Sequence, residues 1–410
     1  MSAPNPVLSP LAQLFNQAGR LAERVGLPIL LDEEDLLERA RLVVGLDDFG
    51  EPGFRIPLRM LIGSLEHEAR LHPLGRLLFR HEIVRSLIVR LRLEDFTRRH
   101  PEVADAPLPP LVVILGLPRT GTTFLHRLMA RDPGLRAFNG WEMLAPVPPA
   151  AGALPTLAAL ESRVQRREQL LFSPEARSRL KAVHDFRADL PEEDWPLLHP
   201  GFLLGLFMYY ARTPTYRDWC ARQDHGPAYG HYRRLLQVLN TGRASAARLV
   251  VKFPMHLSHV DSILDNFPDV RLIWLHRDLQ QVLPSACSLT RNMRGSHSDD
   301  VDPRELGREN LHEAARRLAD GMSAYRRAPS VFVHVRYREL VADPLSTLRR
   351  IYGELALPVG DEADRCFRGY LEQNRRERQG KRHAYSLAEY GIDAGEMREL
   401  TSDYVTEFAL

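Results

Sequence analysis

Short apolar runs rich in β-branched residues recur at four places along the chain, and helical spacing of apolar positions follows each of them. The runs lie at residues 111–115, 248–252, 271–276 and 331–335. Strand-like runs of this length that alternate with helices are typical of βαβ units in a parallel sheet. The pattern therefore predicts an α/β fold with a central parallel sheet.

Helical periodicity dominates the N-terminal part of the chain instead. Apolar positions recur at threes and fours across residues 58–93, and the proline-rich segment 107–110 then interrupts this pattern before the first strand. We expect residues 1–108 to form a helical N-terminal extension packed on an α/β domain at residues 109–410.

The interval between the first and second predicted strands contains no comparable strand pattern, which indicates a helical insertion at about residues 142–245. Its longest apolar stretch, residues 201–211, is too short to span a bilayer, which takes about 20 residues, and it predicts a buried helix. Aromatic residues of the insertion, such as Phe207, Tyr209 and Tyr210, would suit either a bound lipid-like or aromatic alcohol or an ordinary helical core.

Composition excludes several classes of protein. The hydrophobic content is 44% and the net charge is +2, so nothing in the bulk electrostatics indicates nucleic acid or an anionic membrane as a partner. Three widely separated cysteines suggest neither a disulfide framework nor a zinc site. The first 25 residues lack the pattern of a signal peptide, and we expect a cytoplasmic protein. Only three residues are lysine, Lys181, Lys252 and Lys381.

A glycine-containing loop joins the first strand to the helix that follows it. Residues 116–123 read Gly-Leu-Pro-Arg-Thr-Gly-Thr-Thr. A nucleotide-triphosphate P-loop has a lysine for the β- and γ-phosphates, where this chain has Thr122, and the cation lies earlier, at Arg119. The loop therefore favours an anion held by arginine and backbone amides over Mg-ATP. The alternative is an ordinary strand-to-helix turn with threonine caps.

Arg277 follows a strand at its carboxyl end, where open α/β sheets bind ligands, and Ser285 lies on the next helical stretch. Together the two segments resemble sulfotransferases that use 3′-phosphoadenosine 5′-phosphosulfate (PAPS). Residues 116–123 are similar to their 5′-phosphosulfate loop, and Arg277 with Ser285 to their 3′-phosphate pair. The resemblance covers about residues 110–395. It implies a P-loop NTPase-like three-layer fold and PAPS as co-substrate without a metal.

The resemblance also implies a set of donor-binding residues. Tyr337 belongs to a segment like the one that carries the family's adenine-contacting tyrosine, although sheet packing would explain it equally well. Lys381 and Arg382 fit the basic loop that closes over the nucleotide, or a solvated turn. The whole set comprises Pro118, Arg119, Thr120, Gly121, Thr122, Thr123, Arg277, Ser285, Tyr337, Lys381 and Arg382.

Four residues are candidates for catalysis. Lys252 resembles the family's catalytic lysine and would, with Arg119, stabilise the departing oxygen, unless it is a strand-end lysine that reaches solvent. Glu142 occupies the place of a base glutamate found in tyrosylprotein and some bacterial sulfotransferases, and its apolar neighbours would raise its pKa. His256 is the competing base, displaced by two residues from the family's Lys-x-His pattern. Glu142 as a helix cap and His256 as a core histidine are the alternatives.

We therefore expect sulfuryl transfer from PAPS to a hydroxyl of a small-molecule, lipid or carbohydrate acceptor. The acidic segment 191–195 either lines the acceptor side or begins a helix. A P-loop phosphotransferase that uses ATP and a catalytically inactive nucleotide-binding family member remain as alternatives. The sequence leaves the acceptor and the oligomeric state open.

Overall fold

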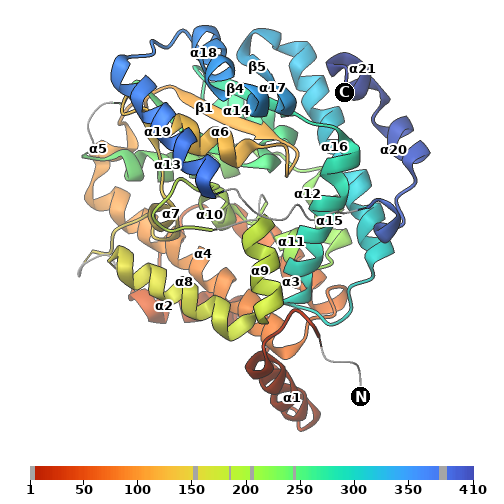
Figure 1. The fold of residues 1–410 in the computed structure, drawn as a ribbon. Helices are drawn as coiled ribbons and strands as arrows, with labels where there is room; N and C mark the ends of the chain where they lie inside the picture. The colour runs from red at the N-terminus through yellow and green to blue at the C-terminus, as the bar shows by residue number, and fades with distance from the viewer. Residues whose placement is uncertain (1–4, 151–155, 184–185, 204–206, 243–245, 378–385) are drawn as a thin grey trace.

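The computed structural model describes residues 5–410 except 151–155, 184–185, 204–206, 243–245 and 378–385 (Figure 1). Its centre is a five-stranded, all-parallel sheet with the strand order β2-β3-β1-β4-β5, which confirms the predicted α/β class. The strands are β1 (Leu111–Gly116), β2 (Leu135–Ala137), β3 (Arg248–Lys252), β4 (Arg271–His276) and β5 (Phe332–Arg336).

The edge strand β2 was not predicted. It is only three residues long, and two of its three residues are half-buried, so no apolar run marks it. It forms because Leu135 pairs in register with Arg248 of β3, a contact between segments that are far apart in the sequence.

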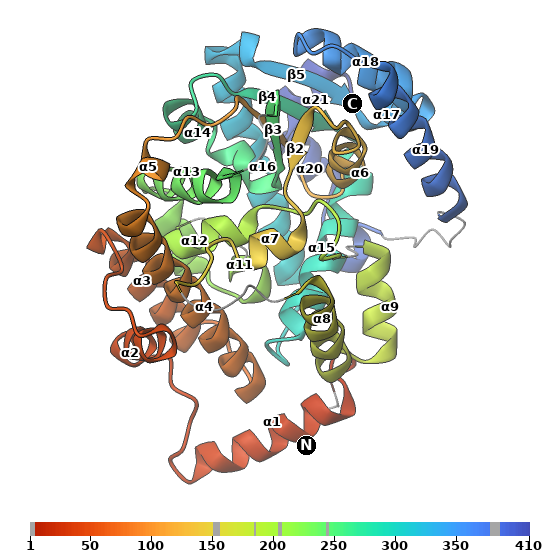
Figure 2. The ribbon, with the colours of Figure 1, turned by 90° about the vertical axis from the view of Figure 1, so that its left-hand side faces the viewer.

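The sheet is buried on both faces, which explains why β1 reads as a continuous apolar run. On one face, Val112 and Ile114 share a buried cluster with residues of several helices, and on the other face Leu111, Val113 and Leu115 share a second cluster with residues of other helices. The layers are visible in Figures 1 and 2. The first set of helices includes α6 (Thr122–Met129), α18 (Pro344–Glu354) and α19 (Asp361–Glu377). The second includes α13 (Gly226–Asn240), α14 (Val260–Asn266), α15 (Leu279–Gly295) and α16 (Pro303–Arg327).

Helices predominate among the described residues before β1 and between β2 and β3. Before β1 lie α1 (Pro10–Arg24), α2 (Glu33–Val44), α3 (Arg55–His67), α4 (Pro73–Arg99) and α5 (Pro101–Ala104). Between β2 and α13 lie α7 (Gly140–Leu144), α8 (Leu157–Leu171), α9 (Pro174–Val183), α10 (Trp195–Leu198), α11 (Phe207–Tyr210) and α12 (Pro214–Cys220). After β5 comes α17 (Tyr337–Ala342), which precedes α18. The last two helices, α20 (Ala394–Leu400) and α21 (Ser402–Phe408), follow α19. Across the described residues, no helix combines the length and the apolar character that a bilayer crossing requires.

The prediction of one buried helix across residues 201–211 is wrong. A 3₁₀ turn, η2 (His199–Gly201), precedes Phe202, which adopts a left-handed backbone with a φ of 55°. A bulky residue in that conformation ends a helical run, and α11 supplies the remaining helical turn.

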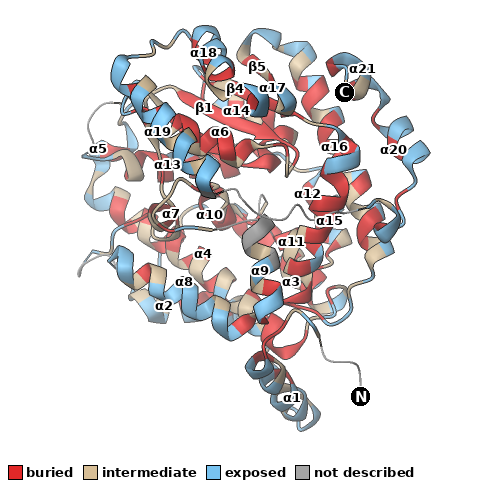
Figure 3. Cartoon of the chain, viewed as in Figure 1, coloured by how far each residue is buried: buried red, intermediate tan, exposed pale blue. Residues whose placement is uncertain are grey.

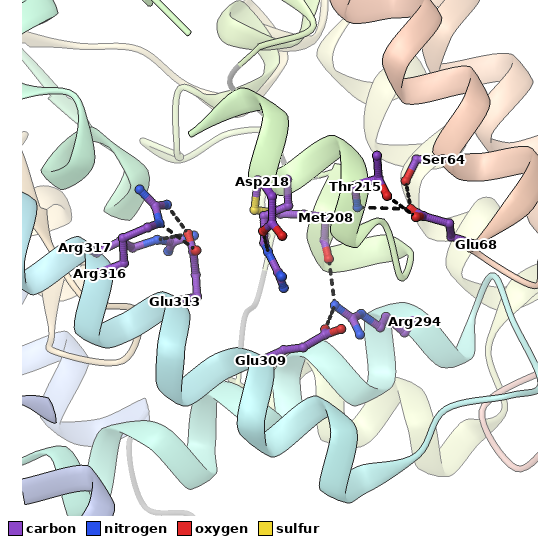
Figure 4. A network of polar contacts seen from close by, with 11 residues as sticks. Ser64, Glu68, Met208, Thr215, Asp218, Arg294, Glu309, Glu313, Arg316 and Arg317 are labelled. Atoms are coloured by element: carbon purple, nitrogen blue, oxygen red, sulfur yellow. Dashed lines mark hydrogen bonds and ion pairs between the residues drawn. The ribbon is translucent and has the colours of Figure 1, made fainter. Parts of the chain in front are cut away.

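The N-terminal helices share a core with the insertion. Leu61 and Phe79 of α3 and α4 belong to the same buried cluster as Phe207 and Tyr216 of α11 and α12. Polar contacts join the same elements (Figure 4): the Thr215 N–H donates to a Glu68 carboxylate oxygen at 3.2 Å. The division at residue 108 stays a prediction, because these helices are packed into one body with the insertion.

Polar contacts also fix α11 to the helices behind it. Arg294 of α15 donates to the Met208 carbonyl at 3.2 Å and pairs with Glu309 of α16 at 2.6 Å (Figure 4). Arg317 of α16 is almost fully buried, pairs with Glu313 at 2.8 Å and donates to the Tyr209 hydroxyl. These contacts hold α11 and its aromatic side chains in place against α15 and α16.

Candidate functional site

The loop between β1 and α6 requires its glycines. Gly116 and Gly121 have φ values of 138° and 98°. A Cβ atom at Gly116 would lie 2.7 Å from the Leu275 carbonyl oxygen, and one at Gly121 would lie 2.8 Å from Cδ2 of Tyr337. The loop therefore runs tightly between β4 and the Tyr337 ring. Since α6 begins at Thr122, its first-turn N–H groups follow directly on the loop, as at other anion sites.

Three predicted donor residues come together beside this loop: Arg277, which follows β4, Ser285 of α15 and Tyr337 of α17. The Arg119 Nε donates to the Ser285 hydroxyl at 3.1 Å, and Arg277 Nη1 donates to the Arg119 carbonyl at 2.8 Å. The Arg277 guanidinium lies 4.0 Å from the centre of the Tyr337 ring. Arg119 thus reaches the serine that the resemblance assigns to the 3′-phosphate.

Arg277 retains a donor for a ligand. Its Nε is buried and makes no hydrogen bond to any residue that the structure describes. Buried Nε atoms of other described arginines, such as Arg136 and Arg294, also lack a partner, so it is the position of Arg277 after β4 and beside the loop that suits it to an anion. The Thr120 hydroxyl, by contrast, donates to the Leu117 carbonyl at 2.7 Å and holds the loop together.

Lys252 ends β3 with a fully buried side chain, so the alternative of a lysine that reaches solvent is wrong. Its Nζ donates to the Thr123 hydroxyl at 3.1 Å and to Oε1 of Glu193 at 2.7 Å. The ammonium therefore joins the phosphate loop to an acidic residue that precedes α10.

Lys252 also affects His126 on α6. Burial, together with this nearby cation, lowers the pKa of His126 to about 3, so that imidazole is neutral.

Glu142 lies at the start of α7 and is 4% exposed. It forms a capping box with Asn139, whose backbone N–H donates to Oε2 at 2.9 Å, and it pairs with Arg136. A cation and a backbone donor therefore lie beside the carboxylate. The sequence-based expectation considered only its apolar neighbours, Trp141 and Met143.

His256 lies in a 3₁₀ turn, η3 (Pro254–Ser258), and is buried. Its Nδ1 is 2.7 Å from the Tyr229 hydroxyl, and its Nε2 is 3.0 Å from Oδ2 of Asp194. The same Asp194 oxygen accepts the Tyr232 hydroxyl at 2.6 Å. Both ring nitrogens of His256 thus have partners in a buried polar cluster. This arrangement agrees with the alternative that His256 is a core histidine.

A cavity of about 290 Å³ opens on the other side of the Lys252–Glu193 pair. Glu193, Pro118 of the phosphate loop and Phe253 next to Lys252 belong to its wall. The rest is largely apolar and comes from α4, α8, α11 and α15, with Leu78, Phe79, Val164, Leu171, Phe207, Tyr209, Tyr210, Leu289 and Met293 among the lining residues.

Residues from two predicted segments line the cavity. Phe207, Tyr209 and Tyr210 of the insertion contribute to its wall, as a role in binding an apolar alcohol requires. Glu193 was recognised only as part of the acidic segment 191–195, because its partner Lys252 is 59 positions away and no local pattern marks the pair.

Lys381 and Arg382 lie outside the described residues, and their role stays a prediction.

Comparison with known proteins places these features in a family. The family model described as "Sulfotransferase family" matches residues 110–361. A curated relative, the omega-hydroxy-beta-dihydromenaquinone-9 sulfotransferase Stf3 of Mycobacterium bovis, is 26% identical over 277 residues, and the match covers 64% of this chain and 66% of the relative. The chain thus spans just under two thirds of that relative's length.

Two solved structures are similar over most of the chain. Sulfotransferase STF9 from Mycobacterium avium has a TM-score of 0.80 at 28% identity, with 91% of this chain and 96% of that chain covered. Sulfotransferase STF1 from Mycobacterium tuberculosis has a TM-score of 0.76 at 28% identity, with 91% and 99% covered. These neighbours confirm the predicted P-loop NTPase-like fold. The family model matches more than half of the chain, and the protein belongs to the sulfotransferase family.

Proposed function

We propose that this protein transfers a sulfuryl group from PAPS to the hydroxyl of a lipid-like alcohol held in the apolar cavity. The observation that carries the proposal is the buried Lys252–Glu193 pair, which contacts the phosphate loop through Thr123 on one side and the cavity on the other. The relative Stf3, whose name gives omega-hydroxy-beta-dihydromenaquinone-9 as its substrate, supports a lipid-like acceptor.

The donor-side residues fit a nucleotide with phosphates at both ends of its ribose. The buried Nε of Arg277 has no hydrogen-bond partner among the described residues, and Arg119 contacts both Arg277 and Ser285. This arrangement suits a 3′-phosphate. The amides that begin α6 and the Thr123 hydroxyl suit a 5′-phosphate. Tyr337, stacked by Arg277, offers a flat surface for adenine. When bound, PAPS supplies an electrophilic sulfur next to a phosphate leaving group.

The acceptor hydroxyl must lose its proton as its oxygen bonds to sulfur, and we assign that proton to the Glu193 carboxylate. Glu193 lines the cavity, whereas Glu142 is not among the described residues that line it and His256 is held by Tyr229 and Asp194. The Lys252 ammonium would stabilise the negative charge that develops on the departing phosphate oxygen. Glu193 therefore takes precedence over Glu142 and His256 as the base.

Glu193→Gln is expected to lower turnover by about 10²- to 10⁴-fold, because the amide cannot accept the proton, and to leave affinity for 3′,5′-diphosphoadenosine nearly unchanged. Single-turnover transfer of labelled sulfate from PAPS to a long-chain primary alcohol measures the first effect, and calorimetry measures the second. Glu142→Gln and His256→Gln serve as matched variants. A large loss in Glu142→Gln with normal turnover in Glu193→Gln would return the role of base to Glu142.

Arg277→Leu is expected to weaken binding of 3′,5′-diphosphoadenosine by about 10- to 100-fold, the effect of losing charge-assisted hydrogen bonds. Binding of adenosine 5′-phosphate, which lacks the 3′-phosphate, should change much less. Calorimetry with both nucleotides measures the difference, and Ser285→Ala should show a smaller loss of the same kind. Tight binding of Mg-ATP by the wild type without any response to the diphosphate would favour a phosphotransferase instead. Binding without turnover would indicate an inactive family member.

A further inference from the structure

Helix α1 is amphipathic, but its apolar side faces outward. A surface helix normally buries its apolar stripe. Here the side that meets the body carries Ala12, Asn16 and Gly19: Asn16 accepts the Leu74 N–H at 2.8 Å, and a Cβ at Gly19 would lie 2.4 Å from Pro73. The large apolar residues on the other side are exposed; this outer stripe consists of Leu11, Leu14, Phe15 and Leu21 of α1 and of Val25, which follows the helix.

The outer stripe belongs to an apolar end of the molecule. Of the fifteen large hydrophobic residues exposed in the described part of the chain, eleven lie between residues 11 and 77 and two lie on α8. The remaining two, Val341 and Leu400, lie on α17 and α20. Figure 2 shows α1 lying along the end of the molecule farthest from the sheet, with α2 and α8 beside it, and Figure 3 shows its surface as mostly exposed.

This apolar end is continuous with the proposed acceptor cavity. Leu8, which precedes α1, and Ala12 in its first turn pack in one cluster with Leu171, and Leu78 and Phe172 lie against that cluster. Leu78, Leu171 and Phe172 also line the cavity. The base of α1 is therefore the outer side of the cavity wall.

Exposed arginines accompany the apolar residues. Arg24 lies in the last turn of α1, and the neighbouring helix α8 exposes Arg163, Arg166 and Arg167, the last of which also lines the cavity. Arginines beside an exposed apolar helix face are the composition of helices that lie in the interface of an anionic bilayer. Exposed carboxylates also occur at this end, and those of Glu34 and Asp35 on α2 pair with Arg55 and Arg80.

We infer that the outer stripe of α1 docks on an anionic lipid bilayer, so that the acceptor passes from the bilayer into the cavity between α4 and α8. The docking itself depends on the surface alone, whereas the identity of the passing molecule rests on the proposed function. An alcohol with a long apolar chain would then reach Glu193 without crossing water.

The docking can be measured without turnover. Full-length protein is expected to cosediment with vesicles of phosphatidylcholine and phosphatidylglycerol, and less with phosphatidylcholine alone. Leu14→Glu combined with Leu21→Glu should lower the bound fraction at least about tenfold, because two apolar anchors become charged. Val341→Glu combined with Leu400→Glu, at the two exposed apolar positions away from this end, should leave binding unchanged. Both double variants alter exposed positions, so their melting temperatures should stay close to that of the wild type.

Three outcomes overturn the inference. The wild type does not bind anionic vesicles, or both double variants lose vesicle binding equally. The third is that the wild type is a dimer in sedimentation velocity and the Leu14–Leu21 variant is a monomer. Assays with a vesicle-embedded long-chain alcohol and a short soluble alcohol separate docking from function. Loss of transfer only to the embedded alcohol in the Leu14–Leu21 variant supports both ideas. If the wild type sulfates neither alcohol, the proposed function fails while vesicle binding still decides the docking.

Discussion

Lys252→Met is expected to lower turnover by at least about a hundredfold, the usual effect of removing one group that stabilises developing negative charge. The methionine fills much of the same volume at the end of β3 but leaves the departing oxygen without its cation. Single-turnover measurement with labelled PAPS gives the loss, and calorimetry with 3′,5′-diphosphoadenosine reports whether the donor site survives.

The same substitution should also destabilise the fold, and the two effects can be separated. Lys252 is fully buried and Glu193 is mostly buried, and breaking a buried ion pair from one side costs about 3–5 kcal/mol. Combining Lys252→Met with Glu193→Gln removes the unpaired carboxylate and should recover much of the stability, but not the turnover. Near-normal turnover in Lys252→Met would contradict the assignment of Lys252 to the leaving oxygen.

Asp194→Ala is expected to lower the free energy of unfolding by about 3 kcal/mol or more, since it leaves two buried groups without their acceptor. The fully buried Asp194 accepts from the Tyr232 hydroxyl at 2.6 Å and contacts His256 at 3.0 Å. Tyr232→Phe, which removes one of these contacts, should cost only about 1 kcal/mol. Denaturant unfolding of the two variants measures the difference, and equal small losses would show that the cluster contributes little.

The pH dependence of stability gives an independent check on Asp194. Burial by itself would raise the pKa of this carboxyl, but the hydrogen bonds and the charge of His256, with the Tyr232 hydroxyl, lower it below its ordinary value. A carboxyl with a lowered pKa in the folded state contributes stability above its unfolded pKa, about 3.9, and that contribution is lost as the pH falls through the folded value. Asp194→Ala should therefore lose less stability than the wild type on acidification below about pH 4.

The sequence predicts those parts of the fold that depend on local patterns. Four strands carry their own apolar runs, whereas the short strand β2 depends on pairing with β3. The phosphate loop is recognisable because its glycines and Arg119 are adjacent in the sequence. The Lys252–Glu193 pair is a tertiary contact, and no spacing rule connects its two members.

Two features carry a sequence signal that does not decide their role. Asn139-Gly-Trp-Glu142 fits the capping-box pattern, which the structure forms, although the position of Glu142 relative to the loop suggested a base. The apolar stripe of α1 is visible as helical periodicity, but periodicity alone predicts that such a stripe is buried. Its outward direction depends on which side of the helix meets Pro73 and Leu74, and that is decided by the packing of the whole chain.

The backbone of the phosphate loop is braced before any ligand arrives. Arg277 donates to the Arg119 carbonyl and the Thr120 hydroxyl donates to the Leu117 carbonyl, while the two glycines hold the turn against β4 and Tyr337. A loop that is already in its binding shape loses little conformational entropy when it takes up an anion. The donor site is therefore pre-organised, and differences in nucleotide affinity should appear mainly as differences in residence time.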